Sequence, residues 1–493
     1  MYTIGYDIGS SSIKVALVDT ATGKSLDVVS QPDNEMGMIS LKNGWAEQNP
    51  NDWWVHVCNA TKLLLAKNNI DSKTIKGIGI SYQMHGLVVV DQKGNPLRDS
   101  IIWCDSRAVK IGKEAFKELG TRKCSENLLN SPANFTASKL KWVKENEPDI
   151  YNSVYKFMLP GDYIAYKFSD NICTTLSGLS EGILWDFTKN TTADWLLDHY
   201  ELDKSKIPDI VSTFSNQGGV SKEGAMASGL TEGTPILYRA GDQPNNALSL
   251  NIFNPGEVAA TGGTSGVMYA VTDSLSAKES SRVNNFAHVN YDTKQIRIGK
   301  LLCINGAGIQ YRWLLNNLDV SSYEEMNQLA ASAPVGSDGV LIHPFGNGAE
   351  RVLDNKNLGT HMSNINLNIH SKAHLCRAAL EGIAFSFVYG IDVMKSDGIQ
   401  PKVIRAGNDN LFRSEIFSTT ISTLINQEIE IYNTTGAIGA ARACQLHLGD
   451  FETFGKQIMD NDFIMQFKPL KERNSFKTAY SRWKDRLDEL LKK

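Results

Sequence analysis

The chain has 493 residues, more than a single hydrophobic core usually supports, so two or three domains are expected. Hydrophobic residues make up 42% and charged residues 21%, which is typical of a folded protein and excludes a disordered one. The 50 basic and 54 acidic residues are intermingled and leave a net charge of −4. This balance argues against a nucleic-acid partner and favours a small-molecule ligand.

The seven cysteines are dispersed without a close pair, a pattern that favours reduced thiols over a disulfide framework or a zinc site. Residues 1–12 contain Asp7 and three serines where a signal peptide would need an apolar run. The chain also lacks a stretch of about 18 uninterrupted apolar residues. We therefore expect a cytoplasmic protein without a membrane partner.

The first predicted element is a hairpin, because strand-like residues 1–5 and 13–18 flank a turn of glycine and serines. A second hairpin of the same kind is predicted from residues 256–260 and 267–271, on either side of the turn at 261–266. The two turns align with Gly9 at Gly263, Ser10 at Thr264 and Ser11 at Ser265.

This repeat has an offset of 254 residues, from Gly9 to Gly263, which is about half the chain. An offset of that size does not indicate a solenoid. It indicates two related domains that each contribute one hairpin to a shared site in an interdomain cleft. We place these domains at residues 1–240 and 241–493.

Between and after the hairpins, strand-like and helical segments alternate, which predicts α/β domains with mixed sheets. The C-terminal stretch 475–493 is amphipathic and predicts a helix. The other predicted strands are 75–81, 87–91, 236–240, 339–342 and 403–407, and the other predicted helices are 52–66, 372–392 and 413–424.

Asp7 closes the first predicted strand and enters the turn of Ser10 and Ser11. A carboxylate beside hydroxyls and backbone N–H groups suits hydrated Mg²⁺ bound against phosphate oxygens. Phosphoryl transfer needs such donors, a metal and a carboxylate that accepts the substrate proton. The alternative is that Asp7 only makes a local turn hydrogen bond.

Asp242 follows Gly241 at a predicted strand-to-helix junction, after the apolar run 236–240. Its carboxylate could simply cap the helix. Its position at the start of the second half of the chain favours a residue that faces a cleft and acts as the base.

Two further segments could lie against a nucleotide. Gly306 and Gly308, and the pair Gly407 and Asn408, follow apolar runs, and small residues there allow close approach to the backbone. Each glycine could equally serve a turn or helix packing. Met84 and His85 fall on a predicted loop, where a lone histidine is more often a structural hydrogen-bonding residue than a catalyst.

Several ordered motifs, taken together, identify a resemblance. From Met1 to about Gly449 the sequence resembles the FGGY carbohydrate kinases and, within them, the xylulokinase-like branch. The motifs are Gly5-Tyr6-Asp7-Ile8-Gly9-Ser10-Ser11-Ser12-Ile13-Lys14, Gly44-Trp45-Ala46-Glu47-Gln48, Gln83-Met84-His85-Gly86, Ile102-Trp103-Cys104-Asp105-Ser106-Arg107, Lys139-Leu140-Lys141-Trp142, Gly241-Asp242 and Gly263-Thr264-Ser265-Gly266.

The resemblance implies two ribonuclease-H-like domains of the actin/hexokinase/Hsp70 type around a cleft. It also implies roles for single residues. Asp242 matches the general base and, with Asp7, the Mg²⁺ site, while Met84 and His85 match the pair that meets the sugar, next to Gln243. The nucleotide side is matched by Ser10, Ser11, Gly263, Thr264, Gly306, Gly407 and Asn408.

The activity that this resemblance implies is ATP-dependent and Mg²⁺-dependent phosphorylation of D-xylulose to D-xylulose 5-phosphate. Within the family, the alternative is a kinase for ribulose, gluconate or a polyol. Outside enzyme function, the alternative is an ATP-driven binding protein of the same fold. The partners expected are a small sugar and, in a homodimer, a second copy of the chain.

Overall fold

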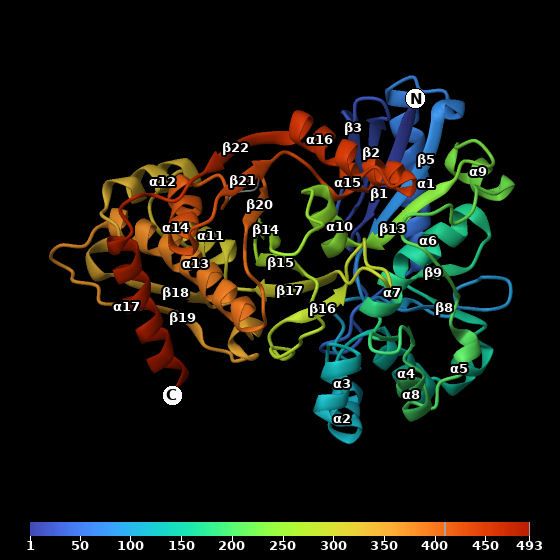
Figure 1. Ribbon diagram of the computed structural model, residues 1–493, viewed down its shortest axis with the longest axis horizontal. Helices are drawn as coiled ribbons and strands as arrows, with labels where there is room; N and C mark the ends of the chain where they lie inside the picture. The colour runs from blue at the N-terminus through green and yellow to red at the C-terminus, as the bar shows by residue number, and fades with distance from the viewer. Residues whose placement is uncertain (409–410, 493) are drawn as a thin grey trace. The chain divides into compact units, whose positions relative to one another are not determined.

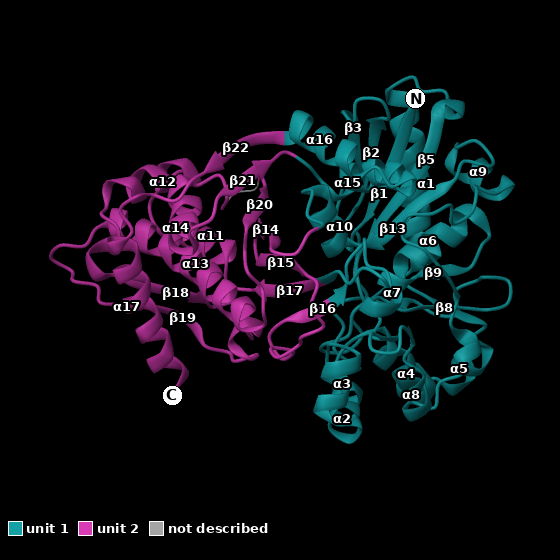
Figure 2. Ribbon diagram, viewed as in Figure 1, with its two compact units in different colours: residues 1–253, 286–298, 434–462 teal, residues 254–285, 299–433, 463–493 magenta. Residues whose placement is uncertain are grey.

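The computed structural model describes residues 1–408 and 411–492 (Figure 1). The chain forms two compact units, which Figure 2 distinguishes by colour. Unit 1 comprises Met1–Phe253, Phe286–Ile298 and Thr434–Asp462, and unit 2 comprises Asn254–Asn285, Gly299–Asn433 and Phe463–Lys493. Both units combine helices with mixed sheets.

Unit 1 is built on a five-stranded sheet with the order β13-β5-β1-β2-β3. Strand β1 pairs antiparallel with β2, which pairs antiparallel with β3, whereas β5 runs parallel to β1 and β13 parallel to β5. The first predicted hairpin is therefore confirmed. The strands are β1 (Tyr2–Ile8), β2 (Ile13–Asp19), β3 (Ser25–Gln31), β5 (Ile75–Tyr82) and β13 (Ile236–Gly241).

Unit 2 holds most of a seven-stranded sheet with the order β16-β17-β15-β14-β20-β21-β22. Strands β14 and β15 form the second predicted hairpin, and β20 and β21 continue the sheet in parallel to β14. The strands are β14 (Glu257–Gly262), β15 (Gly266–Thr272), β16 (Asn284–Ala287), β17 (Ile298–Ile304), β20 (Val403–Gly407), β21 (Ile429–Tyr432) and β22 (Phe463–Phe467).

The two sheets share one topology. In each, a hairpin is extended by a third strand on one side and by two parallel strands on the other, so that β3-β2-β1-β5-β13 corresponds to β17-β15-β14-β20-β21. The internal repeat that the turn residues indicated is thus a repeat of structure. Each sheet is completed by strands from later in the chain, which no short motif could show.

The remaining elements of unit 1 surround its sheet and form small two-stranded sheets. The helices are α1 (Pro50–Lys67), α2 (Val109–Leu119), α3 (Thr121–Asn127), α4 (Thr136–Asn146), α5 (Pro148–Ser153), α6 (Pro160–Ser169), α7 (Leu176–Glu181), α8 (Asp194–His199), α9 (Lys222–Ser228), α10 (Asp242–Ser249), α15 (Gly436–Ala443) and α16 (Phe451–Asp462), with 3-10 turns at Ser72–Thr74, Lys204–Lys206 and Cys444–Leu448. The short strands are β4 (Glu47–Gln48), β6 (Val88–Val90), β7 (Ser100–Ile101), β8 (Lys156–Met158), β9 (Cys173–Thr175), β10 (Trp185–Asp186), β11 (Thr191–Thr192) and β12 (Asp209–Val211).

Unit 2 is organised around α13, a long helix that is buried along most of its length. A helix that is apolar nearly all round is stable only inside a core, and α13 packs among the buried residues of β14, β15, β17 and β20. The helices are α11 (Gly308–Asn317), α12 (Tyr323–Ser332), α13 (Lys372–Ser396), α14 (Glu415–Ile425) and α17 (Asn474–Leu491), with β18 (Leu341–Phe345), β19 (Gly359–Ser363) and 3-10 turns at Ser337–Gly339 and Arg351–Leu353.

Helix α15 lies late in the sequence but packs on the sheet of unit 1, beside β1 at the start of the chain (Figure 1). Two glycines permit this close approach. A Cβ on Gly5 would lie 2.0 Å from the carbonyl oxygen of Ala437, and one on Gly79 would lie 2.0 Å from that of Ala440. Backbone thus meets backbone where side chains would normally intervene.

The compact units therefore divide the chain differently from the predicted boundary at 240/241. Unit 1 continues through α10 to Phe253, because α10 packs against α15, and it takes back residues 434–462. This difference arises from packing between segments far apart in the sequence, which two consecutive halves of the chain cannot represent.

The seven cysteines are all free, as the sequence predicted. Among the described residues, no helix is long and apolar enough to cross a membrane.

We expect Gly79→Ala to destabilise unit 1, because its new methyl group would meet the backbone of Ala440 and no side-chain rotation can relieve that contact. Overpacking of this kind costs about 1–3 kcal/mol or more. Thermal melts should show a lower Tm for Gly79→Ala. Gly37→Ala is the matched control, because a Cβ at Gly37 has no neighbour within 4 Å. Equal melting of the two variants would contradict this packing.

Candidate active site

Asp7 and Asp242 lie at the same edge of the unit 1 sheet. Strands β1, β5 and β13 run in parallel, and their pairing places Asp7 beside Ser81, which is in turn beside Ala240. Asp242 follows two residues later, as the first residue of α10. The carboxyl ends of parallel strands are where ligands bind in open α/β sheets. The two predicted aspartates are therefore brought together by the strand order.

The Asp7 carboxylate is half-buried and tightly surrounded. Its Oδ1 accepts a hydrogen bond from Ser81 Oγ at 3.0 Å. A Cβ on Gly436, at the start of α15, would lie 2.8 Å from Asp7 Oδ2. Burial raises the pKa of Asp7, while Ser81 and the charge of Lys14 oppose the rise.

Burial also raises the pKa of Asp242, to about 7, and the negative charge of Asp7 adds to the rise. The N–H groups at the start of α10 and the side chain of Gln243 oppose it by donating to the carboxylate. A carboxylate whose pKa lies near neutrality is well suited to accept a proton in a transition state. An aspartate that only caps a helix does not require a second, repelling carboxylate such as Asp7 nearby.

The same pair can hold a hard cation. Mg²⁺ prefers oxygen ligands and usually binds one or two carboxylates together with waters and substrate phosphates. Asp7 and Asp242 supply two carboxylates whose pKa values are raised, so that a cation would relieve their repulsion. The described residues contain no group of three or more His, Cys, Asp or Glu that could hold a metal by itself. The residues present fit Mg²⁺ shared with phosphate.

Met84 and His85 follow β5 on the loop that the sequence predicted. Met84 is buried, and His85 has a left-handed backbone with φ 62°. The imidazole of His85 packs edge-on against Phe135, with ring centroids 4.8 Å apart, and beside Phe286 at 5.2 Å. The histidine is therefore held in one orientation by its ring as well as by its backbone.

The tautomer of His85 follows from its hydrogen bond. Its Nδ1 lies 3.0 Å from the backbone carbonyl oxygen of Glu181. A carbonyl can only accept, so we infer that Nδ1 carries the proton. In the neutral ring Nε2 is then the acceptor, which suits the hydroxyl proton of a sugar.

Lys139 holds the His85 loop from the other side. Its Nζ donates to the carbonyl oxygens of His85 at 2.8 Å and Ile102 at 2.9 Å. Burial lowers the pKa of Lys139 to about 7, and the charge of Asp105 opposes this change. A buried amine thus takes the place of backbone partners that an irregular loop lacks.

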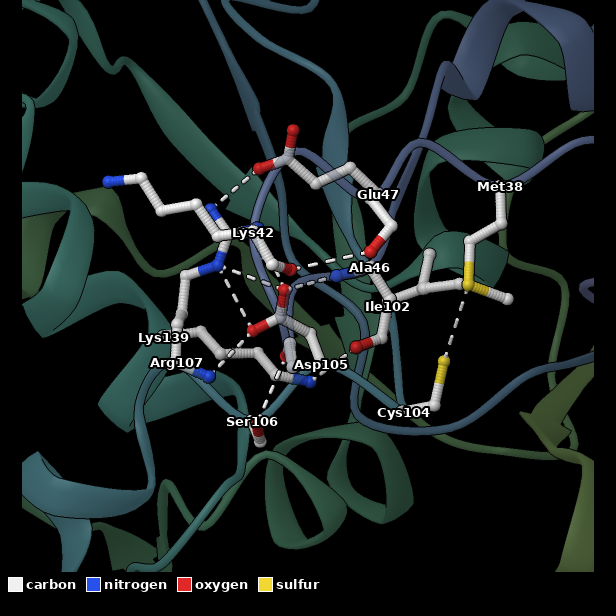
Figure 3. A network of polar contacts seen from close by, with 12 residues as sticks. Met38, Lys42, Ala46, Glu47, Ile102, Cys104, Asp105, Ser106, Arg107 and Lys139 are labelled. Carbon is white, nitrogen blue, oxygen red and sulfur yellow. Dashed lines mark hydrogen bonds and ion pairs between the residues drawn. The ribbon is translucent and has the colours of Figure 1, made fainter.

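A buried ion-pair network supports this loop (Figure 3). The Asp105 carboxylate accepts from Arg107 Nη2 at 2.7 Å and from the backbone N–H of Ala46 at 2.6 Å. Arg107 also pairs with Glu47 at 2.6 Å. Three of the motifs quoted above, at 44–48, 102–107 and 139–142, therefore meet in one scaffold.

The first hairpin is joined to the same scaffold. Gln48 Nε2 donates to the carbonyl oxygen of Ser10 at 2.7 Å, and Gln48 Oε1 accepts from Gln83 at 3.3 Å. The carbonyl oxygen of Ser11 accepts from Met36. These bonds fix the turn through its carbonyl groups.

In unit 2 the second hairpin lies on the N-terminus of α11. The carbonyl oxygens of Gly263 and Thr264 accept from the N–H groups of Gly308 at 3.2 Å and Ile309 at 3.0 Å. A Cβ on Gly308 would lie 2.2 Å from the Gly263 oxygen. A pocket opens here, lined by Gly262, Gly263, Thr264, Gly308, Tyr311, Arg312, Tyr323, Asn327 and Leu411.

The other nucleotide residues predicted in unit 2, Gly306, Gly407 and Asn408, are not among the residues that line this pocket. Gly306 packs under Pro344, and its N–H donates to Glu350 Oε1 at 2.6 Å. Gly407 ends β20 with open space where a Cβ would stand, and the N–H of Asn408 donates to Tyr432. Their roles stay predictions.

Sequence reasoning did not select several residues that the structure places at these sites. Tyr311 and Arg312 could have been found from their spacing after Gly308, one turn along the same helix. Glu350 and Glu181 carry no local signal, because each is a single glutamate whose importance comes from burial.

The repeated α/β topology, the aspartate pair at a strand edge and the glycine-rich hairpin on a helix N-terminus define a phosphotransferase of the two-domain kinase class. The N-terminal and C-terminal domains of the FGGY family of carbohydrate kinases match residues 2–249 and 258–443. The chain therefore belongs to this family, and it is a carbohydrate kinase that uses ATP.

Individual relatives span the whole chain. A xylulose kinase from Haemophilus influenzae is 28% identical over 99% of both chains. Among solved structures, a xylulose kinase from Rhodospirillum rubrum has a TM-score of 0.88 at 22% identity and covers 99% of both chains. A gluconate kinase from Lactobacillus acidophilus has a TM-score of 0.87 at 21% identity, covering 99% of this chain and 98% of its own. The structural matches confirm the predicted fold.

We expect Lys139→Met to loosen the His85 loop, because the carbonyl oxygens of His85 and Ile102 would lose their buried donor. Leaving a buried acceptor unpaired costs about 1–3 kcal/mol. Thermal melts should show a lower Tm, and initial rates should show a higher KM for the sugar with little change in the KM for ATP. Lys110→Met is the control, since its side chain is 85% exposed. An unchanged sugar KM would refute the role of Lys139.

Proposed function

We propose that this kinase transfers the γ-phosphoryl group of ATP to a hydroxyl of D-xylulose, giving D-xylulose 5-phosphate and ADP. The observation that carries the reaction is Asp242, a half-buried carboxylate with a pKa of about 7 at the start of α10. The choice of sugar is supported by relatives named xylulose kinase that match 99% and 92% of the chain.

In unit 1, Asp242 accepts the proton of the attacking hydroxyl as the new P–O bond forms. His85 Nε2 accepts a hydrogen bond from another hydroxyl, and Gln243 donates to a sugar oxygen beside it. Met84 packs on the carbon chain. The support for this role is that the Met84 side chain lies against Gly241, the residue before Asp242, with Met84 Cγ 2.6 Å from where a Cβ would stand.

Asp7 and Asp242 would hold Mg²⁺, which supplies positive charge for the phosphate oxygens. The phosphate donors proposed are Ser10 and Ser11 in unit 1 and Gly263 and Thr264 in unit 2, with Gly306, Gly407 and Asn408 toward the adenosine. For the second hairpin, the support is the pocket that Gly263 and Thr264 line together with Arg312, whose guanidinium could pair with an anion. The homodimer stays a prediction.

A panel of sugars in a coupled ADP assay tests the substrate. We expect D-xylulose to give the highest kcat/KM among D-xylulose, L-ribulose, gluconate and glycerol, with turnover abolished by EDTA and restored by Mg²⁺. Gluconate is included because a gluconate kinase shares the fold at a TM-score of 0.87. If gluconate or glycerol is the best substrate, the choice of sugar is wrong although the family stands.

Asp242→Asn keeps the shape of the side chain and removes the proton acceptor. We expect kcat to fall by about 10²–10⁴-fold, because general-base catalysis is lost, while the affinities for sugar and ATP stay near those of the wild type. Initial rates and calorimetric titrations measure these quantities. Near-normal turnover would show that Asp242 only caps α10.

The same variant should be more stable than the wild type at neutral and alkaline pH. The pKa of Asp242 is raised to about 7 in the folded state, so between about pH 4 and 7 the folded protein retains a proton that the unfolded chain has lost. Stability linked to this proton is present below about pH 4 and is lost as the pH rises through 7. In EDTA and without ligands, the Tm of Asp242→Asn should match the wild type near pH 4 and exceed it above pH 7.

A constant difference in Tm across that pH range would contradict the raised pKa of Asp242. Ser249→Ala on the same helix serves as the control, because it carries no titrating group and its Tm difference should not follow the pH.

A further inference from the structure

Glu181 is a buried carboxyl group that the proposed reaction does not use. It is the last residue of α7, and only 1% of its surface is exposed. A buried carboxylate that only stabilises a fold is normally paired with a cation. Among the residues that the structure describes, Glu181 has no ion pair. The nearby guanidinium of Arg239 is paired instead with Asp162, at 3.0 Å.

The carboxyl of Glu181 is surrounded by acidic and polar groups. The hydroxyl of Tyr82 lies beside its carboxyl, and the charges of Asp242 and Asp162 both act against its ionisation. No described residue donates a hydrogen bond of ordinary geometry to its Oε1. The groups that favour the ionised carboxyl are the hydroxyl of Tyr82 and the backbone N–H of His85.

Besides Tyr82, Glu181 contacts His85 at two places. The backbone N–H of His85 donates to the Glu181 carboxyl, and the ring Nδ1 of His85 donates to the Glu181 backbone oxygen at 3.0 Å. His85 has φ 62°, a conformation that costs a residue with a Cβ free energy unless its surroundings fix it. Glu181 therefore binds both the backbone and the ring of a residue in a strained conformation.

Glu181 also lies against the strand end that carries Asp242. A Cβ on Gly241 would lie 2.4 Å from Glu181 Oε2 and 2.6 Å from Met84 Cγ. The absence of a side chain at residue 241 is what makes room for both. One carboxyl thus contacts the loop of Met84 and His85 and the residue that precedes the base.

We propose that Glu181 is a positioning residue. It holds His85 and Met84 in the arrangement beside Asp242 that the sugar requires, and it does not touch the substrate itself. This inference rests on the proposed sugar-binding role of His85 and Met84. With Glu181 in place, His85 presents Nε2 at a fixed position relative to the base. Without it, the loop can relax from φ 62°, and each sugar molecule that binds must first restore the productive geometry.

The test compares two replacements of similar size in the full chain. Glu181→Gln keeps an oxygen that can accept from the His85 N–H, whereas Glu181→Met fills the space and cannot accept. We expect Glu181→Met to raise the sugar KM, and the calorimetric Kd for D-xylulose without nucleotide, by about 10- to 100-fold. We expect the KM for ATP to change by less than about threefold, and Glu181→Gln to bind sugar within about threefold of the wild type.

Glu350 is the matched control, since it is also buried but lies in unit 2, where it accepts from the N–H groups of Asn305 and Gly306. Glu350→Met should leave the Kd for D-xylulose unchanged. Should Glu181→Met fail to fold, Glu181→Asp, which withdraws the carboxyl by one methylene, takes its place with the same expectation.

An unchanged Kd for D-xylulose in Glu181→Met would overturn the inference. Equal rises in the KM for sugar and for ATP would overturn it too, and so would a Glu181→Gln variant that binds sugar much more weakly than the wild type. Failure of the proposed function gives a different result, because the wild type itself would then not bind or turn over D-xylulose. The comparison is in that case made with the best sugar of the panel, and the same outcomes decide it.

Discussion

The site depends on one electrostatic conflict, the placement of two carboxylates, Asp7 and Asp242, at the same sheet edge with limited access to water. Burial raises the pKa of both, and the charge of Asp7 raises that of Asp242 further. The fold keeps the two carboxylates together because β1, which carries Asp7, and β13, which leads into Asp242, lie on either side of β5 and run parallel to it, and α15 packs against Asp7. A carboxyl with a pKa near neutrality, suited to accept a proton, and two carboxylates whose charge a cation could offset both follow from that conflict.

Other buried groups of unit 1 hold the loop of Met84 and His85. Lys139 holds the carbonyl of His85, Glu181 holds its N–H and ring, and the pair of Asp105 and Arg107 supports the neighbouring segment. These groups are buried and polar, so each is costly unless its partners are in place. Such a network stabilises one arrangement of the loop rather than many.

Elements with a local pattern could be predicted from the sequence. Both hairpins were predicted correctly, because a Gly/Ser/Thr turn between β-branched runs can be recognised within about fifteen residues. The return of residues 434–462 to unit 1 could not be predicted, since it depends on Gly5 and Gly79 leaving room for α15 some 360 to 430 residues away. The motifs singled out Asp7 and Asp242, which the strand order brings to one sheet edge, whereas nothing in the neighbours of Glu181 signals its burial.

Similarity of fold does not decide which sugar is phosphorylated, because a xylulose kinase and a gluconate kinase superpose on this chain almost equally well. Discrimination must come from single hydrogen bonds. The carbonyl of Glu181 fixes the proton of His85 on Nδ1, so Nε2 can accept from a hydroxyl but cannot donate to a carboxylate. A hydroxyl at that position can donate to Nε2, whereas a carboxylate at the same position carries no proton to donate. A site that leaves a buried polar group unpaired discriminates more strongly than a change in packing does. The tautomer that α7 imposes on His85 therefore favours a hydroxyl over a carboxylate beside Nε2.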